Sequence, residues 1–428
     1  MSATDPHPAA HHATHRTIEA VWRIESARVI AGLTRLTRDV GLAEDLAQEA
    51  LLAALEQWPQ TGVPENPGAW LTATAKRRAI DLFRRNTVAE RKHQDLARDL
   101  ATLEQTVPDL NSNLDDPIGD DLLRLVFISC HPVLSTESRA ALTLRLLGGL
   151  TTPEIARAFL TPESTIAQRI VRAKRILADK HIPFEVPRGP ELAARLASVL
   201  EVIYLLFNEG YSATAGDDLM RPALCEEALR LGRILAELTP NEPEVHGLVA
   251  LMEIQTSRTR ARIGPTGEPI LLFEQNRAHW DLLLIQRGLA AIDRAHTIGK
   301  PRGPYLLQAE LAACHARART PEETDWPRIV SLYTDLAHLT PSPVIELNRA
   351  VAVSMVHGPQ AALDLVEALA TDPSLAHYHL LPSVRADLLL KLNRPAEARH
   401  HFEQAAALTQ HPRERALLLN RAAACQTK

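Results

Sequence analysis

The stretch Leu146–Leu177, LLGGLTTPEIARAFLTPESTIAQRIVRAKRIL, has the pattern of two helices joined by a short turn. Pro153 favours a helix start, and the small Ala156 allows a second helix to approach closely. After a turn near Thr161, apolar residues recur at spacings of three or four and mark the second helix. The positions that we expect to be buried are Ile166, Ile170, Ala173 and Leu177.

The opposite face of this second helix is polar and basic. Arg and Gln hydrogen-bond base edges in the major groove, and Ser and Thr contact bases or phosphates. An αα-hairpin with a solvated basic face is the alternative, but the small Ala156, the short turn and the outward cations together favour a DNA-binding helix-turn-helix. At about 100° per residue, the predicted contacts are Ser164, Gln168, Arg172 and Arg175 on the outward face, with Thr165 and Arg169 on its shoulder.

Charge alternates along the chain before this motif. Residues 39–75 contain no Lys or Arg, 76–92 are rich in both, and 95–121 are acidic again and contain Pro, Asn and Ser. The basic run suits phosphate neutralisation, and the second acidic run predicts a solvated linker. Each run alone is also typical of a solvated helix face. The net charge of -5 conceals this alternation, so it does not exclude nucleic acid as a partner.

A first amphipathic helix is predicted over residues 41–55. Its apolar positions repeat at helical spacing, which leaves Asp45, Gln48 and Glu49 together on the other face. One face packs and the other is free to bind. We expect Trp58-Pro59 to end this helix.

A Gly/Pro/Asn loop over residues 60–68 precedes a second, basic helix that starts near Ala69. An aromatic beside cations suits melted DNA, because a flipped base needs a stacking surface and the backbone needs positive charge. Packing in the core explains Trp70 equally well, because a large aromatic side chain often fills space there. The candidate DNA-binding residues here are Trp70, Lys76, Arg77, Arg78, Asp81, Arg84 and Arg85.

Together these segments resemble the extracytoplasmic-function (ECF) sigma factors of the sigma-70 family. DVGLAEDLAQEALLAAL resembles region 2.2, which docks on the clamp helices of the β′ subunit of RNA polymerase. This implies that Asp45, Gln48 and Glu49 bind RNA polymerase core with its β′ and β subunits. NPGAWLTATAKRRAIDLFRRN resembles regions 2.3 and 2.4, which implies recognition and melting of the promoter −10 element. The helix-turn-helix resembles region 4.2, the reader of the −35 element. The family commonly has Gly-Thr-Val where this chain has Ser164-Thr165-Ile166, so the individual base contacts stay open.

More than half of the chain follows this part, and it too is helical in composition. HGPQAALDLVEAL and LNRPAEARHHFEQAAAL align with Pro359 on Pro395 and Ala362 on Ala398, a period of 36 residues. This is close to the tetratricopeptide (TPR) period of about 34 residues. Stacked helix pairs form a concave surface that suits a protein or peptide ligand, although a solenoid that serves only stability is the alternative.

Other stretches, among them FNEGYSA and HWDLLLI, resemble the sigma-factor subgroup that carries such an extension, which implies regulation within the extension itself. The polar and aromatic residues of these stretches are better explained by structural hydrogen bonds than by ligand binding. They are Tyr204, Asn208, Glu209, Tyr211, Trp280, Asp281, Tyr305, His315 and Asn348.

Aromatic residues, which are enriched in strands, make up only 4% of the chain. We therefore predict an all-α protein. Phosphate-loop, H-E-x-x-H and G-x-S-x-G motifs are absent and the four cysteines are far apart, so we expect no enzyme, cofactor, metal or disulfide. With neither a leader nor a membrane span in the pattern, we expect a cytoplasmic protein. The predicted domains are region 2 (16–95), an acidic linker (96–117), region 4 (118–181), a helical extension (187–290) and TPR-like repeats (291–425).

One rival class shares the helix-turn-helix. A DNA-binding regulator with a TPR-like partner-binding domain would not need the acidic docking helix, because it would not bind polymerase. Binding to core polymerase discriminates between the two hypotheses.

Overall fold

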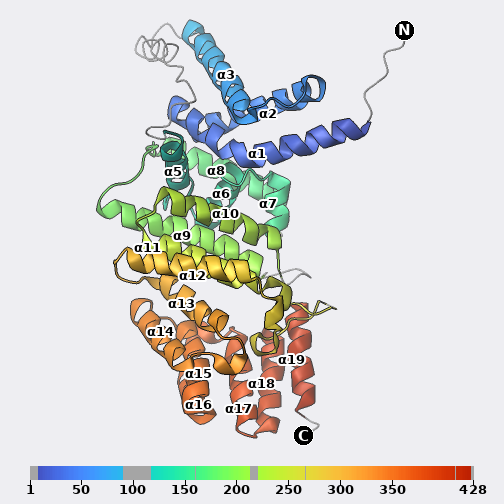
Figure 1. The fold of residues 1–428 in the computed structure, drawn as a ribbon, viewed down its shortest axis with the longest axis vertical. Coiled ribbons are helices and arrows are strands. Elements are labelled where there is room, and N and C mark those ends of the chain that lie inside the picture. The colour runs from blue at the N-terminus through green and yellow to red at the C-terminus, as the bar shows by residue number, and fades with distance from the viewer. Residues whose placement is uncertain are drawn as a thin grey trace. The chain divides into compact units, whose positions relative to one another are not determined.

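The computed structural model describes residues 8–89, 117–159, 161–212, 220–265, 267–409 and 411–425 (Figure 1). Every long element in these ranges is a helix, and the one extended pairing among them is an isolated bridge between Ile263 and Pro269. The expected all-α fold is confirmed. The chain divides into two compact units, residues 1–202 and 203–428.

The first unit holds the helices that carry the sequence motifs. They are α1 (Pro8–Thr37), α2 (Val40–Thr61), α3 (Pro67–Ala89), α5 (Pro117–Ser129), α6 (Thr136–Leu146), α7 (Thr152–Phe159), α8 (Glu163–Asp179) and the first part of α9 (Pro190–Tyr211).

Helix α2 starts at a side-chain cap and runs further than the sequence predicts. The Asp39 carboxylate accepts hydrogen bonds from the backbone N–H groups of Gly41 (2.7 Å) and Leu42 (3.0 Å). The helix passes through Pro59 and ends at Gly62, whose φ of +85° favours glycine and whose N–H bonds the Trp58 carbonyl. The prediction that Trp58-Pro59 ends the helix is therefore wrong. A proline in the final turn disturbs only that turn.

Helix α1 packs against α2 and α3 and also against α5. The turn between α6 and α7 approaches α1 closely at Gly149. A Cβ atom added there would lie 2.9 Å from Ser26 Oγ, and the φ of +66° is itself unfavourable for other residues. Glycine is thus required at this contact.

The first part of α9 packs with the helices that precede it. Arg195 donates to the Phe127 carbonyl (3.0 Å), and Ser198 Oγ donates to the Cys130 carbonyl (2.6 Å). Arg139 on α6 donates to Glu201 (3.0 Å) and to Ser198. The division between the units accordingly falls inside α9, after the boundary near residue 187 that the sequence predicts.

The second unit is a series of helices, most of which begin with proline, whose fixed φ and missing N–H are tolerated at a first helical position. They are α10 (Pro222–Leu238), α11 (Pro243–Ser257), α12 (Leu282–Thr297), α13 (Pro304–Arg317), α14 (Trp326–Leu339), α15 (Pro343–His357), α16 (Pro359–Leu369), α17 (Leu380–Lys391), α18 (Pro395–Leu408) and α19 (Pro412–Ala424), with short 3₁₀ turns between some of them.

Successive helices of this unit share small cores, as stacked repeats do. The two aligned prolines, Pro359 and Pro395, begin the helices α16 and α18 (Figure 1). The aligned Ala362 and Ala398 are both fully buried. The period of 36 residues thus relates two equivalent helices.

Two general features bear on the sequence predictions. Within the described ranges, no helix combines the length and apolar character needed to cross a bilayer. Cys130, Cys225, Cys314 and Cys425 are unpaired thiols, and burial raises the pKa of Cys130 to about 11.

Candidate nucleic-acid interface

The helix-turn-helix is built on a reciprocal cap at the start of α7. The Thr151 N–H donates to Glu154 Oε2 (2.8 Å), and the Glu154 N–H donates to Thr151 Oγ1 (3.4 Å). Burial alone would raise the pKa of Glu154, but hydrogen bonds from Thr151 and Arg23 hold it below its ordinary value. Ala156 is buried and its carbonyl accepts from the Thr161 N–H (3.0 Å), which closes the turn.

Helix α8 has the predicted faces. The apolar stripe Ile166, Ile170, Ala173 and Leu177 is buried. All four residues predicted to point outward are exposed, and the two on the shoulder are partly exposed. The exposed residues are Ser164, Gln168, Arg172 and Arg175, and those on the shoulder are Thr165 and Arg169.

On α2, the three candidate docking residues also share a face away from the buried alanines. Asp45 is 70% exposed and Glu49 52%, and Gln48 is partly exposed. Glu49 forms an ion pair with Arg78 on α3, with 2.8 Å between the guanidinium nitrogen and the carboxylate oxygen. A candidate docking residue and a candidate DNA-binding residue are therefore already joined to each other.

The basic helix α3 carries its aromatic against the end of α2. Trp70 is partly exposed and packs edge-on against the buried Trp58, with ring centroids 5.3 Å apart. The side chain thus fills space on one side and reaches solvent on the other, which agrees with both interpretations of this residue.

The charged residues of α3 mostly reach solvent. Lys76, Arg77, Asp81 and Arg84 are exposed, and Arg78 is partly exposed; the Arg85 side chain lies outside the described residues. Partial desolvation, followed by the charge of Arg35, lowers the pKa of Lys76, while the nearby Asp121 opposes this shift.

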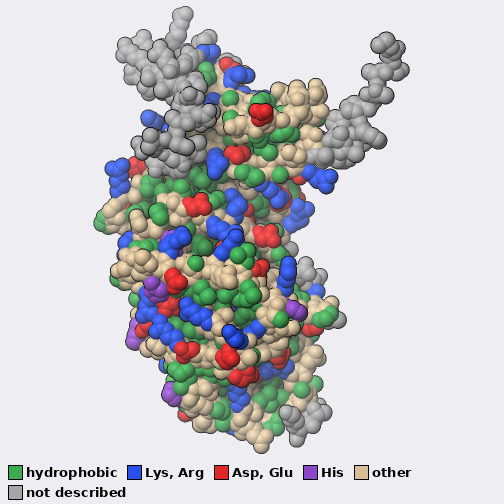
Figure 2. Space-filling model, in the orientation of Figure 1, with side chains coloured by type: hydrophobic (Ala, Val, Ile, Leu, Met, Phe, Trp, Pro, Cys, Tyr) green, Lys and Arg blue, Asp and Glu red, His purple; other side chains and the backbone are tan. Residues whose placement is uncertain are grey.

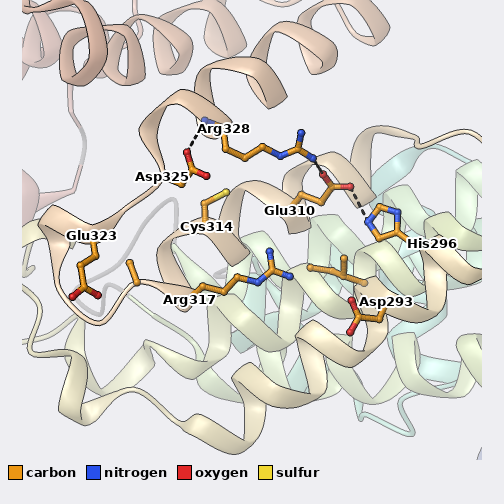
Figure 3. A pocket seen from close by; sticks show the side chains of 10 residues that line it. Asp293, His296, Glu310, Cys314, Arg317, Glu323, Asp325 and Arg328 are labelled. Carbon is orange, nitrogen blue, oxygen red and sulfur yellow. Dashed lines mark hydrogen bonds and ion pairs between the residues drawn. The ribbon is translucent and has the colours of Figure 1, made fainter.

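A pocket of about 400 Å³ lies in the second unit, between α12, α13 and the start of α14 (Figure 3). Glu310 is 6% exposed and binds Arg328 (2.9 Å) and His296 (3.2 Å). Asp293 and Arg317 also line the pocket. Its wall therefore presents charges of both signs.

Family comparisons match three parts of the chain. Sigma-70 region 2 matches residues 23–88, sigma-70 region 4 matches residues 124–177, and a family of unknown function, DUF6596, matches residues 195–296. The ECF RNA polymerase sigma factor SigL of Mycobacterium tuberculosis is 33% identical over 149 residues, which cover 33% of this chain and 76% of SigL. The chain belongs to the ECF sigma factors of the sigma-70 family.

Two further relatives show how far the similarity of this sigma factor extends. An uncharacterized protein of Rhizobium meliloti is 43% identical over 396 residues, which cover 91% of this chain and 92% of that protein. The probable ECF sigma factor SigI of Mycobacterium tuberculosis is 26% identical over 175 residues, covering 40% of this chain and 58% of SigI. No solved structure matches the chain.

The structure also brings two residues to these surfaces that the sequence analysis did not select. Val171 is 65% exposed and lies between Gln168 and Arg175 on the outward face of α8. A helical projection at about 100° per residue places Val171 on this face. It was not selected because only polar residues were considered as DNA contacts. The other is Glu44. In the sequence it is one more acidic residue beside Asp45, but in the structure it is buried, and its partners Arg145 and Lys174 come from distant parts of the chain.

Proposed function

We propose that this sigma factor binds RNA polymerase core and directs it to promoters, and that its extension controls this activity in cis. The observation that carries the first part is the exposed face of α8, where Ser164, Gln168, Arg172 and Arg175 lie opposite a fully buried stripe. Exposed Arg and Gln on a second helix are what major-groove reading requires.

We assign polymerase docking and DNA binding to different predicted domains. In region 2 (16–95), Asp45, Gln48 and Glu49 dock on core polymerase, and α3 binds the −10 element. In region 4 (118–181), α8 binds the −35 element, with Val171 added to the polar residues on its outward face. SigL and SigI are named as RNA polymerase sigma factors, which supports the same assignment here. The α3 residues proposed to bind and melt DNA are Trp70, Lys76, Arg77, Arg78, Asp81, Arg84 and Arg85.

Binding to core polymerase distinguishes this proposal from the alternative, a DNA-binding regulator that does not bind polymerase. The full chain should retain core polymerase in a pull-down and support transcription in vitro. The triple variant Asp45→Ala, Gln48→Ala, Glu49→Ala should lose most of this binding. Glu56→Ala, an exposed acid on the same helix, should not. A folded triple variant that binds core normally would refute the docking face.

Control by the extension (187–290 and 291–425) is supported by two observations. The Rhizobium meliloti relative aligns over nearly the whole chain, so the extension accompanies the sigma domains there as well. In addition, Arg139 and Arg195 bind the first part of α9 to α5 and α6, so a change in α9 would reach the DNA-reading domain.

The coupling is best tested in the full chain, because truncation near residue 180 would also remove the part of α9 that packs on α6. Arg139→Ala removes the hydrogen bond to Glu201 and should lower promoter output at unchanged core binding. Arg188→Ala, an exposed arginine just before α9, is the control. Equal output from both variants and the wild type would exclude this coupling.

For the ligand of the repeats, the chemistry of the pocket favours a peptide that carries charges of both signs. Asp293 offers a partner for a cation and Arg317 one for an anion. On the visible face of the described second unit, basic and acidic side chains are interspersed, which suits a protein or peptide better than nucleic acid (Figure 2). Short peptides of mixed charge should raise the melting temperature of the wild type. They should not raise that of the double variant Asp293→Asn, Arg317→Gln.

A further inference from the structure

Three partly buried arginines of the second unit form no ion pair with any described residue. They are Arg258 at the end of α11, Arg262 just after the 3₁₀ turn Thr259–Ala261, and Arg277 in the 3₁₀ turn Arg277–His279. Other partly buried arginines of this unit do pair with acids, as Arg221 does with Glu209 and Arg233 with Glu253. Buried charges are normally paired, so these three lack a counterion within the described part of the chain.

Neutral groups hold the three guanidinium groups in place. Arg258 donates to the Tyr211 hydroxyl (2.6 Å), and Arg262 Cζ lies 3.6 Å from the centroid of the same tyrosine ring. Arg277 donates to the His315 carbonyl (2.7 Å) in the last turn of α13. The end of a helix carries roughly half an elementary negative charge, so it offsets only part of one guanidinium charge.

The indole ring of Trp280 is shared by two of these arginines. The Cζ atoms of Arg258 and Arg277 lie 5.7 Å and 4.9 Å from its ring centroid, within the range of cation–π contacts. Trp280 is 5% exposed, but its Nε1–H has no acceptor among the described residues, and neither has the Nε–H of either arginine. The structural hydrogen bond expected for Trp280 is therefore absent there. Three N–H donors in one cluster match an anionic acceptor.

The positive charges of this cluster also disfavour one another. Burial lowers the pKa of Arg262 and of Arg277, and the charge of Arg258 adds to the effect on both. Burial, and then the charges of Arg258 and Arg277, lowers the pKa of His315 to about 4. The carboxylates that act on Arg262 or Arg277 from a distance form no ion pair with them; they are Glu322, Glu323 and Glu414. Arginine stays protonated in proteins, so the cluster stays positive and attracts an anion.

We propose that Arg258, Arg262 and Arg277 form a binding site for a small, doubly charged oxyanion, either free phosphate or the phosphate group of a small phosphomonoester. Planar guanidinium groups bind phosphate oxygens in pairs. Small ligands are largely buried when bound, so partly buried arginines suit them better than a nucleic-acid backbone. None of the three arginines lines the pocket of mixed charge described above. The site gives a ligand class to the part of the chain that matches DUF6596, residues 195–296.

Isothermal titration calorimetry of the full wild-type chain with sodium phosphate tests this site. At about pH 8, phosphate carries about two negative charges. Sodium chloride at matched ionic strength screens weak binding to exposed cations and serves as the control anion. Phosphate should bind at one saturable site and raise the melting temperature, and chloride should do neither. Glycerol phosphate identifies the source of the oxyanion: weaker binding than phosphate favours the free ion, and equal or tighter binding favours a phosphomonoester.

Variants show whether the arginine cluster holds the phosphate. Arg258→Gln and Arg277→Gln each remove one guanidinium group and should weaken phosphate binding about tenfold or more, as expected for a lost hydrogen bond to a charged group. Arg260→Gln is the matched control, because Arg260 is exposed and its loss changes the net charge equally. It should bind phosphate as the wild type does. Circular dichroism checks that each variant folds, and if one does not, the other still decides.

The proposal is overturned if the wild type shows no saturable phosphate site. It is also overturned if folded Arg258→Gln and Arg277→Gln bind phosphate as tightly as the wild type, or if Arg260→Gln weakens binding as much as they do. Either result would place the phosphate elsewhere or attribute its binding to net charge. Because these measurements use neither polymerase nor DNA, their failure leaves the proposed function standing, and a chain that fails to bind core could still hold the anion.

Discussion

Lys174 Nζ lies 2.5 Å from Glu44 Oε2, although Lys174 belongs to the same helix as the exposed Gln168 and Arg172. Helix α8 therefore has three faces: an apolar stripe in the core, an outward face proposed to read DNA, and a flank that contacts α2. Because Lys174 is on the flank, substitutions of the outward face should affect promoter recognition without opening the contact with α2.

Arg172→Ala and Gln168→Ala should each cost about 1 to 3 kcal/mol of promoter binding by the polymerase complex if the residue reads a base, and relax the preference at one base pair. Fluorescence anisotropy with single-base variants of the upstream element measures both effects. Lys180→Ala, just beyond α8, is the control and should preserve the sequence preference. Unchanged affinity and preference in Arg172→Ala would mean that the assigned face is wrong.

Val171 should contact the 5-methyl group of a thymine, because apolar side chains in the major groove recognise that group. Replacing each thymine of the upstream element by uracil removes only the methyl group. The wild type should lose affinity at one position, by up to about 1 kcal/mol. Val171→Ala should not distinguish thymine from uracil there. Equal losses in both proteins would show that another residue makes the contact.

The sequence predicts the outward and buried faces of α8 correctly, because helical periodicity determines them locally. It also places Asp45, Gln48 and Glu49 on one solvent-facing side of α2. The same reasoning could not find the Glu44 cluster, since Arg145 and Lys174 lie about a hundred residues or more away and are brought to α2 by tertiary packing. The continuation of α2 through Pro59 was missed because propensity rules treat proline as a stop.

Gly149→Ala should destabilise the chain by about 1 to 3 kcal/mol, because it forces a residue with a Cβ into a left-handed backbone conformation and against Ser26. Gly32→Ala is a matched comparison on α1, where nothing lies within 4 Å of the added Cβ. It should stabilise by about 0.5 to 1 kcal/mol, since alanine is the better helix former. Urea unfolding followed by circular dichroism gives both values, and a neutral Gly149→Ala would contradict the close approach to α1.

His131 should make the first unit sensitive to mild acid. Its Nδ1 accepts a hydrogen bond from the Val133 N–H (3.0 Å). Burial, and then the charge of Arg195, lowers the pKa of this histidine from 6.5 to about 4. Below pH 6.5 the unfolded chain takes up a proton that the folded chain does not. The free energy of unfolding should therefore fall as the pH drops from about 6.5 to 4, and this contribution should level off below 4.

His131→Asn tests this directly, because an asparagine Oδ1 can accept the same N–H in a local turn but does not titrate in this range. Urea unfolding of both proteins at pH 7 and pH 5 gives the comparison, in which the carboxylates common to both largely cancel. The variant should lose less stability than the wild type between these two values. If the two losses are equal, His131 is protonated as easily in the folded chain as in the unfolded one, and neither its burial nor the charge of Arg195 lowers its pKa.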